Sequence, residues 1–154
     1  MWYNISEVIF LRIFNSNSVE ETHRIGEKLG SVLKSGDVVA YFGGMGMGKT
    51  TFTHGLARGL GIDEKEVSSP TFALVHEYRG KINTLYHFDM YRIESWDDLY
   101  STGFFDYLDL GGILAVEWSE NIENALPENS IKVTFRHGEN ENDRIIEIEG
   151  VDLE

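Results

Sequence analysis

The sequence predicts a single α/β domain over residues 1–154, with a mixed, mostly parallel central sheet that is flanked by helices and extended by antiparallel hairpins. The length of 154 residues suits one domain with one core of ordinary size. Segments of strand character alternate with segments of helical periodicity in the first half of the chain. The continuous apolar run Ile113–Val116 is typical of a central parallel strand that is covered on both faces.

The first strand and helix are expected between residues 8 and 36. Val8–Phe14 is rich in branched and aromatic residues, which favours a strand. Ser18 and Glu21 have the spacing of a capping box at a helix start, and Gly36 is the expected end of that helix. The apolar face of this helix is expected to consist of Ile25, Leu29, Val32 and Leu33.

A second strand and a second helix enclose a glycine-rich loop. Asp37–Gly43 is short and apolar, which predicts a strand that leads directly into the loop. After the loop, apolar residues recur at helical spacing, and Gly61 is the expected end of this helix. These apolar residues are Phe52, Leu56 and Leu60.

The second half of the chain predicts hairpins around the central strand. Residues 72–79 and 82–89 flank a Gly-Lys turn and are expected to pair with each other. Residues 95–108 predict a short amphipathic helix and a turn. Alternating residues at 130–138 and 143–150 predict a terminal antiparallel pair of strands.

The composition limits the class of protein. The net charge of −13, from 13 basic and 26 acidic residues, argues against strong direct binding of nucleic acid. The acidic excess serves solubility or offers a face to a basic partner. The absence of cysteine excludes a disulfide scaffold, a zinc–thiolate site and a cysteine nucleophile. The N-terminal residues lack the features of a secretory signal and no apolar run approaches the ~20 residues that span a bilayer, so a cytoplasmic protein is expected.

The glycine-rich loop contains the clearest functional motif. Gly43, Gly48, Lys49 and Thr50 match the pattern G-x-x-x-x-G-K-[ST], and the motif lies between a predicted strand and a predicted helix, as this pattern requires. Glycines let consecutive backbone N–H groups point at an anion, which the N-terminus of the helix also favours. Lys49 is expected to reach the β- and γ-phosphates, and Thr50 to coordinate Mg²⁺. The loop residues expected to contact the nucleotide are Gly44, Met45, Gly46, Met47, Gly48, Lys49, Thr50 and Thr51.

A phosphate-binding loop also predicts an acidic residue at the end of a neighbouring strand, where it holds the metal or orients water. Glu117 directly follows the apolar run of the central strand and is the preferred metal-binding carboxylate. Asp89 ends the strand predicted at 82–89 and is expected to act on metal-bound or attacking water. Each of them could instead be a solvated carboxylate at a strand end.

The Ser/Thr-rich loop after the second helix has the position of a switch element. Ser69 and Thr71 are placed to sense the γ-phosphate, and Pro70 should stiffen the segment. Local hydrogen bonding within the loop explains the same residues equally well.

Other polar and aromatic residues have weaker signals. His76 and His87 lack metal-ligand spacing and are expected to be structural. Trp118 could stack on a base or fill the core. Arg92 and Arg136 could contact phosphate, although no spacing requires it.

Four stretches of the chain resemble one known family. In chain order they are GGMGMGKTTF, SSPTFALVHEY, YHFDMYR and VEWSENI. They resemble the small bacterial P-loop ATPase of tRNA threonylcarbamoyladenosine synthesis, the TsaE family, across nearly the whole chain. The first stretch is generic to NTPases, whereas the other three and their order are more specific.

The resemblance implies a compact α/β P-loop domain that binds and hydrolyses ATP with Mg²⁺. It also implies work with the TsaB–TsaD complex, which transfers threonylcarbamoyl to adenosine 37 of ANN-decoding tRNAs, so that contact with tRNA is expected to be indirect or weak. By motif match, Lys49 is the phosphate lysine, and Thr50 and Glu117 hold Mg²⁺. Asp89 is the second functional carboxylate.

The same resemblance places two more residues and shows one departure. Thr71 belongs to the switch-like loop, and Trp118 lies near the nucleotide. The second loop position is often acidic in the family and is Gly44 here, while Met45 and Met47 replace smaller or aliphatic residues. These differences concern the rigidity of the loop and leave its phosphate-binding backbone intact.

The expected activity is a weak intrinsic ATPase that a partner increases, because the sequence shows no evident arginine finger or water-orienting glutamine. Two alternatives remain. A small-molecule P-loop kinase would need an acceptor pocket and usually an arginine-rich lid, which the sequence does not suggest. A nucleotide-dependent interaction module would bind ATP and its partner without hydrolysing ATP.

Overall fold

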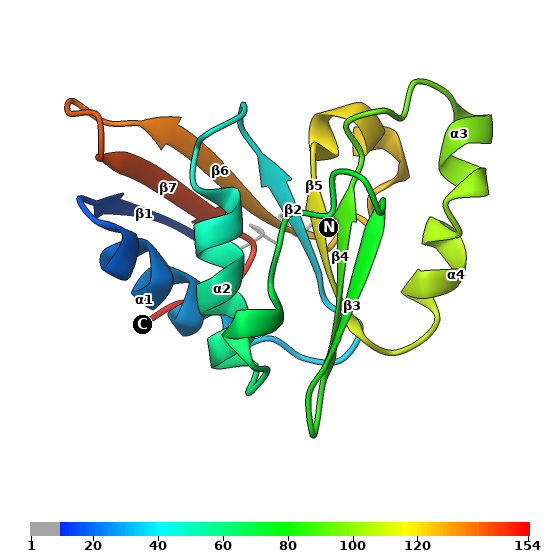
Figure 1. Ribbon diagram of the computed structural model, residues 1–154, viewed down its shortest axis with the longest axis horizontal. Helices are drawn as coiled ribbons and strands as arrows, with labels where there is room; N and C mark the ends of the chain where they lie inside the picture. The colour runs from blue at the N-terminus through cyan, green and yellow to red at the C-terminus, as the bar shows by residue number, and fades with distance from the viewer. Residues whose placement is uncertain (1–9) are drawn as a thin grey trace, which may run out of the picture.

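In the computed structural model, which describes residues 10–154, a seven-stranded sheet runs through the centre of the molecule (Figure 1). The elements in chain order are β1 (Leu11–Ser16), α1 (Val19–Gly30), β2 (Val38–Phe42), α2 (Lys49–Gly59), η1 (Glu64–Glu66), β3 (Val75–Arg79), β4 (Thr84–Asp89), α3 (Trp96–Ser101), α4 (Phe104–Leu108), β5 (Ile113–Glu117), η2 (Ser119–Ala125), β6 (Ile131–His137) and β7 (Arg144–Glu149). The strand order is β1-β7-β6-β2-β5-β4-β3. The central strands β6, β2, β5 and β4 run parallel, and antiparallel strands extend both edges. The predicted mixed α/β fold is confirmed, although Val8 and Ile9 of the first predicted strand lie outside the described residues.

The two faces of the sheet pack against two separate hydrophobic cores, because side chains alternate along each strand. Val39 and Ala115 face α1 and α2 and belong to the first core. Val38 and Leu114 face α3 and α4 and belong to the second. β5 is buried along its whole length, which confirms the prediction from its continuous apolar run.

Helix α1 begins where the capping box predicts and ends earlier than expected. Ser18 Oγ accepts a 3.1 Å hydrogen bond from Glu21 N, which fixes the N-terminus. The helix ends at Gly30, so the expected end at Gly36 is wrong. The chain needs the residues after Gly30 to turn back toward β2, and Gly36 occupies part of this turn with a φ of 89°. Val32 therefore lies beyond the helix, is exposed, and does not join the apolar face.

Helices α1 and α2 approach closely because glycines line their contact (Figure 1). A Cβ on Gly26 would lie 2.3 Å from Phe52 O, and one on Gly55 would lie 2.1 Å from His23 O. The other two glycines of this contact are Gly30 and Gly59. Since α2 begins at Lys49, the position of α1 fixes where the phosphate-binding loop ends.

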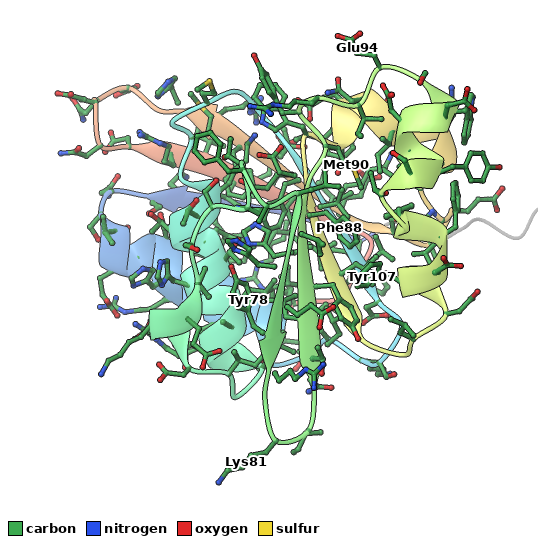
Figure 2. The ribbon with its side chains drawn as sticks, turned by 45° about the vertical axis from the view of Figure 1, so that its right-hand side comes forward. Tyr78, Lys81, Phe88, Met90, Glu94 and Tyr107 are labelled. Atoms are coloured by element: carbon green, nitrogen blue, oxygen red, sulfur yellow. The ribbon has the colours of Figure 1, made fainter. Side chains whose placement is uncertain are left out.

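The two predicted hairpins form, but β3 is shorter than the sequence suggests. The strand predicted at 72–79 begins at Val75 because the preceding residues make a turn in which Leu74 N donates to Pro70 O at 2.8 Å. The β3–β4 and β6–β7 pairs are antiparallel, as predicted. Figure 2 shows Lys81 at the tip of the β3–β4 hairpin, which extends away from the sheet.

The short helix and turn predicted at 95–108 form two short helices, α3 and α4. The division falls at Gly103, whose φ of 78° is in the left-handed region and interrupts the helix. Across residues 10–154, every helix is too short or too polar to cross a bilayer.

Candidate nucleotide-binding site

The glycine-rich loop connects β2 to α2 at the edge where the central parallel strands end. Gly46 and Gly48 have φ values of 73° and 94°, which residues with a Cβ rarely adopt. Gly48 is also the N-cap of α2, and its carbonyl accepts a 2.9 Å hydrogen bond from Phe52 N. The loop thus presents its backbone beside the first turn of α2, where unpaired N–H groups and the helix dipole favour an anion.

A cavity of about 540 Å³ lies against this loop. Every residue predicted from the sequence to contact nucleotide or metal lines it. These residues are Gly44, Met45, Gly46, Met47, Gly48, Lys49, Thr50, Thr51, Thr71, Asp89, Glu117 and Trp118. Ser69 lines the cavity as well, and so do Tyr91 and Arg144, which were not predicted.

The two candidate carboxylates lie side by side because β4 and β5 pair in a register that places Asp89 opposite Glu117. Both side chains are buried, at 6% exposure each. Asp89 Oδ1 accepts a 2.9 Å hydrogen bond from Tyr91 N. Glu117 Oε2 lies 3.0 Å from His87 Nε2. Since each carboxylate has a second oxygen, both retain an acceptor for a cation or for water.

Lys49 is held over the indole ring of Trp118. Its Nζ lies 4.3 Å from the ring centroid, and the indole in turn packs on Tyr91 with a centroid separation of 5.0 Å. Burial lowers the pKa of Lys49, and the charge of Glu117 opposes this effect. A cation–π contact of this kind keeps the ammonium beside the loop, where phosphate oxygens are a stronger partner. Trp118 therefore lines the cavity and also packs against the second hydrophobic core.

The predicted switch segment faces the same cavity. Ser69 Oγ and Thr71 Oγ1 lie 2.7 Å apart, and both side chains are exposed. They share one hydrogen bond with each other, which confirms the expected local bonding, while contact of either residue with a γ-phosphate stays a prediction.

A hydrogen-bonded chain connects this segment to Glu117. The hydroxyl of Tyr78 donates to Ser68 O at 2.9 Å, accepts from Ser68 N at 3.1 Å, and lies 3.4 Å from His87 Nδ1. His87 is fully buried, and its Nε2 contacts Glu117. The sequence predicts a structural role for His87, because its spacing from other candidate ligands is not that of a metal site. The signal that was missed is its position two residues before Asp89, which puts both side chains on the same face of β4.

Arg144 reaches the loop from β7. Its Nη2 donates to Gly46 O at 3.1 Å, and its Nη1 donates to two backbone carbonyls of the β6–β7 turn. Its Nε is buried and has no hydrogen-bond partner within residues 10–154. The two arginines considered from the sequence lie elsewhere: Arg136 pairs with Glu147, and Arg92 is exposed outside the cavity lining.

The donor atoms at the cavity suit a hard cation that arrives with a nucleotide. Within the described part of the chain, no group of three or more His, Cys, Asp or Glu side chains could hold a metal by itself. Mg²⁺ in nucleotide sites takes only one or two protein oxygens, because phosphates and water complete its octahedron. Thr50, Glu117 and Asp89 supply hydroxyl and carboxylate oxygens around the same cavity, so the residues present fit such a metal.

A parallel strand that enters a glycine loop, followed by a helix that begins with Lys49 and Thr50, defines the P-loop class of nucleotide-binding folds. The sequence profile of the family described as "Threonylcarbamoyl adenosine biosynthesis protein TsaE" matches residues 16–146. The chain therefore belongs to the TsaE family, as its four motifs predicted.

Individual relatives support this membership. A Treponema pallidum protein is 40% identical over 121 residues, which cover 79% of this chain and 88% of that protein. A Bacillus subtilis protein is 40% identical over 117 residues, which cover 76% of this chain and 72% of that protein. Both are named tRNA threonylcarbamoyladenosine biosynthesis protein TsaE. The crystal structure of Bacillus subtilis YdiB matches with a TM-score of 0.74 and 30% identity, covering 96% of this chain and 90% of that one.

Proposed function

We propose that this protein binds and hydrolyses ATP with Mg²⁺, and that its ATP turnover supports the TsaB–TsaD complex in forming threonylcarbamoyladenosine at position 37 of tRNA. The names of its relatives support the biosynthetic role. The observation that supports the ATP chemistry is the convergence of Lys49, Asp89 and Glu117 on one cavity beside the glycine loop. The net charge of −13 supports an indirect or weak contact with tRNA, and a cytoplasmic location suits that substrate.

The loop and its cations bind the phosphates. Backbone N–H groups at Gly44–Gly48 cradle the phosphate chain, and Lys49 leaves the ring of Trp118 to contact the β- and γ-phosphates. Arg144 holds Gly46 O and thereby fixes the shape of the loop while adding positive charge. Thr51 lines the cavity at the first turn of α2, where it contacts the phosphate nearest the nucleoside.

The nucleoside occupies a second cavity on the other side of the loop. This cavity, of about 340 Å³, lies between the N-terminus of α1 and the β6–β7 turn. Gly48, Thr51 and Arg144 line both cavities, so one ligand can extend from one to the other. Asn17 and Asn142 supply amide groups there that can pair with a base or a ribose.

The acidic side of the cavity carries out the hydrolytic step. Thr50 and Glu117 hold Mg²⁺, which when bound neutralises charge on the phosphates. Asp89, whose Oδ1 is fixed by Tyr91 N, orients the attacking water with its second oxygen. Thr71 on the segment opposite the loop contacts the γ-phosphate. Within residues 10–154, no arginine other than Arg144 lines the cavity, so intrinsic turnover is slow and the partner complex increases it.

The proposal is tested by phosphate release from ATP, measured with and without TsaB–TsaD. We expect slow release by the protein alone, faster release with the complex, and a loss of at least about 100-fold for Lys49→Ala. Glu117→Ala should reduce Mg²⁺-dependent turnover more than metal-free nucleotide binding. Lys81→Ala, at the hairpin tip far from the cavity, is the matched control and should behave like the wild type (Figure 2).

The same assay separates the alternatives. A small-molecule kinase would release no free phosphate and would transfer it to an added acceptor. An interaction module would bind ATP and the complex without any release. Reconstitution of the tRNA modification over several turnovers, with the protein present or omitted, tests the biosynthetic role; equal yields in both reactions would exclude it.

A further inference from the structure

A buried row of polar side chains crosses three neighbouring strands beneath the site. In the β3–β4 register His76 lies opposite His87, and in the β4–β5 register Asp89 lies opposite Glu117. Side chains two residues apart on one strand share a face, so Tyr78, His87 and Glu117 all face α2. Tyr78 is 3% exposed and His87 is fully buried, so solvent reaches neither.

The Tyr78 hydroxyl is the anchor of the switch segment. Both backbone groups of Ser68 bond to it, the N–H at 3.1 Å and the carbonyl at 2.9 Å. Ser68 is followed directly by Ser69 and, two positions later, by Thr71, which line the nucleotide cavity. The start of the switch segment is thus held from β3 by the Tyr78 hydroxyl, and His76 Nδ1 adds a contact of 3.3 Å to Ser68 Oγ.

One proton on this hydroxyl has more than one acceptor. It points to Ser68 O at 2.9 Å, while two ring nitrogens lie near the same oxygen, His76 Nδ1 at 3.1 Å and His87 Nδ1 at 3.4 Å. An imidazole whose Nε2–H donates to Glu117 carries a lone pair at Nδ1 and therefore seeks a donor. When Ser68 moves, two ring nitrogens remain as partners of the hydroxyl, His76 Nδ1 and His87 Nδ1, and a bond to His87 holds the imidazole, and with it the Glu117 carboxylate, more firmly.

We propose that Tyr78 and His87 are positioning residues that couple the Ser68–Thr71 segment to Glu117, so that a triphosphate contacting Thr71 and a metal held by Glu117 strengthen each other's binding. The inference rests on the proposed function of this site. Such coupling is reciprocal: whatever the triphosphate adds to metal affinity, the metal adds to triphosphate affinity.

The test is a double-mutant cycle on metal affinity. Mn²⁺ binding to the complex with a non-hydrolysable ATP analogue is measured by electron paramagnetic resonance for the wild type, Thr71→Ala, Glu117→Gln and the double variant. The whole cycle is then repeated with Tyr78→Phe added. In the first cycle the Mn²⁺ affinity of the double variant should differ by at least about threefold from the value obtained by multiplying the effects of the two single substitutions. Such a deviation is expected because members of one hydrogen-bonded network interact. With Tyr78→Phe the deviation should vanish.

Two further variants control for a merely structural effect. Tyr107→Phe also removes a hydrogen-bonded tyrosine hydroxyl, which donates to Glu77 Oε1 at 3.1 Å. Tyr107 packs against the other core, across the β3–β4 hairpin from Tyr78 (Figure 2). It should leave the coupling intact. His87→Gln keeps an amide donor for Glu117 and loses the ring nitrogen that faces Tyr78, so it should abolish the coupling as Tyr78→Phe does. Thermal unfolding shows which variants are folded. If Tyr78→Phe does not fold, the coupling is judged from His87→Gln.

The outcomes separate this inference from the function on which it rests. A wild type that binds the analogue without any dependence on Mn²⁺ would remove the proposed metal-dependent function. A wild type that binds both ligands but shows no deviation in the first cycle would overturn the coupling alone. An unchanged deviation in a folded Tyr78→Phe or His87→Gln protein would also overturn it.

Discussion

A single added methyl group at Gly55 should disturb both the stability of the protein and its phosphate site. In Gly55→Ala the new Cβ would lie 2.1 Å from His23 O and 2.8 Å from His23 C, which are backbone atoms of α1. Backbone atoms of a helix cannot turn aside as a side chain can, so α2 has to move away from α1 by roughly 1 Å to restore ordinary contact. Gly26, Gly30 and Gly59 lie in the same contact, and a Cβ on any of them would also come within 2.4 Å of a backbone oxygen of the opposite helix.

Two opposing effects set the size of the change. Alanine is favoured over glycine inside a helix by about 1 kcal/mol. The clash acts in the opposite direction. A gap of about 0.5–1 Å between α1 and α2 removes a quarter to a half of the dispersion attraction across their contact. Overpacking of this kind lowers the unfolding free energy by about 1–3 kcal/mol. Leu29, Phe52 and Leu56 are fully buried beside this contact, so the cost lies at the upper end of the range. The net loss of unfolding free energy should be about 1–2 kcal/mol.

The shift should also reach the nucleotide. Lys49 and Thr50 are the first residues of α2, so a displaced helix carries them away from the position that the loop defines. A misplacement of about 1 Å in a positioned group should reduce turnover on the order of tenfold or more.

Urea unfolding followed by circular dichroism measures the stability, and phosphate release at a temperature where both proteins are folded measures turnover. Ile82→Ala, at an exposed position of the β3–β4 hairpin that lines neither cavity, is the control and should stay within about 0.5 kcal/mol of the wild type. A Gly55→Ala protein that is as stable as the wild type, or more so, would show that helix propensity outweighs the clash and would refute the reasoning.

Three other substitutions or measurements address single contacts. Arg144→Ala removes the donor to Gly46 O and should weaken nucleotide binding about tenfold in calorimetric titration, since charged hydrogen bonds contribute about 1.5–3 kcal/mol; unchanged affinity would contradict its role. Tyr41→Phe deletes a buried hydroxyl that donates to Thr53 Oγ1 at 2.9 Å, and should lower the unfolding free energy by about 1 kcal/mol in urea, whereas no loss would show that the bond is not formed. In a variant that retains only Trp118 among the tryptophans, nucleotide should change the fluorescence emission as the ammonium leaves the ring; a constant spectrum would mean that the cation–π contact persists.

The parts of the site that sequence reasoning located are those fixed by local chain geometry. The glycine loop with Lys49 and Thr50 is contiguous, so its pattern already contains the relative positions of its residues. Glu117 was predictable for a related reason: carboxyl ends of parallel strands meet at one edge of a sheet, and a continuous apolar run identified β5 as a central strand. Asp89 followed from the same rule on β4.

Other features of the fold and the site depend on contacts between segments that are distant in the sequence, and no sequence pattern predicts them. Arg144 lies 98 residues from the carbonyl that it holds, and nothing in the alternation of β7 distinguishes it from Arg136. His87 was judged by spacing along the chain, but its partner lies across a strand pair. The end of α1 was misplaced because Gly36 resembles a helix terminator, while the actual end depends on where α2 and β2 require the chain to turn.

The two halves of the site are positioned by different means, and this difference has a measurable consequence. The proposed phosphate side, with Lys49, is set by backbone contact between α1 and α2 at glycines, where no side chain can turn aside. The proposed metal side, with Glu117, is set by strand register and by the hydrogen bond to His87, whose other ring nitrogen lies 3.4 Å from the Tyr78 hydroxyl, where a proton can change partners. A change at the helix contact should therefore weaken nucleotide binding even when no metal is present. A change in the hydrogen-bonded row should leave metal-free nucleotide binding intact and reduce only the gain in nucleotide affinity that the metal provides. The reason is that a rigid contact fixes Lys49 whether or not a ligand is present, whereas an exchangeable proton makes the position of Glu117 depend on the ligand.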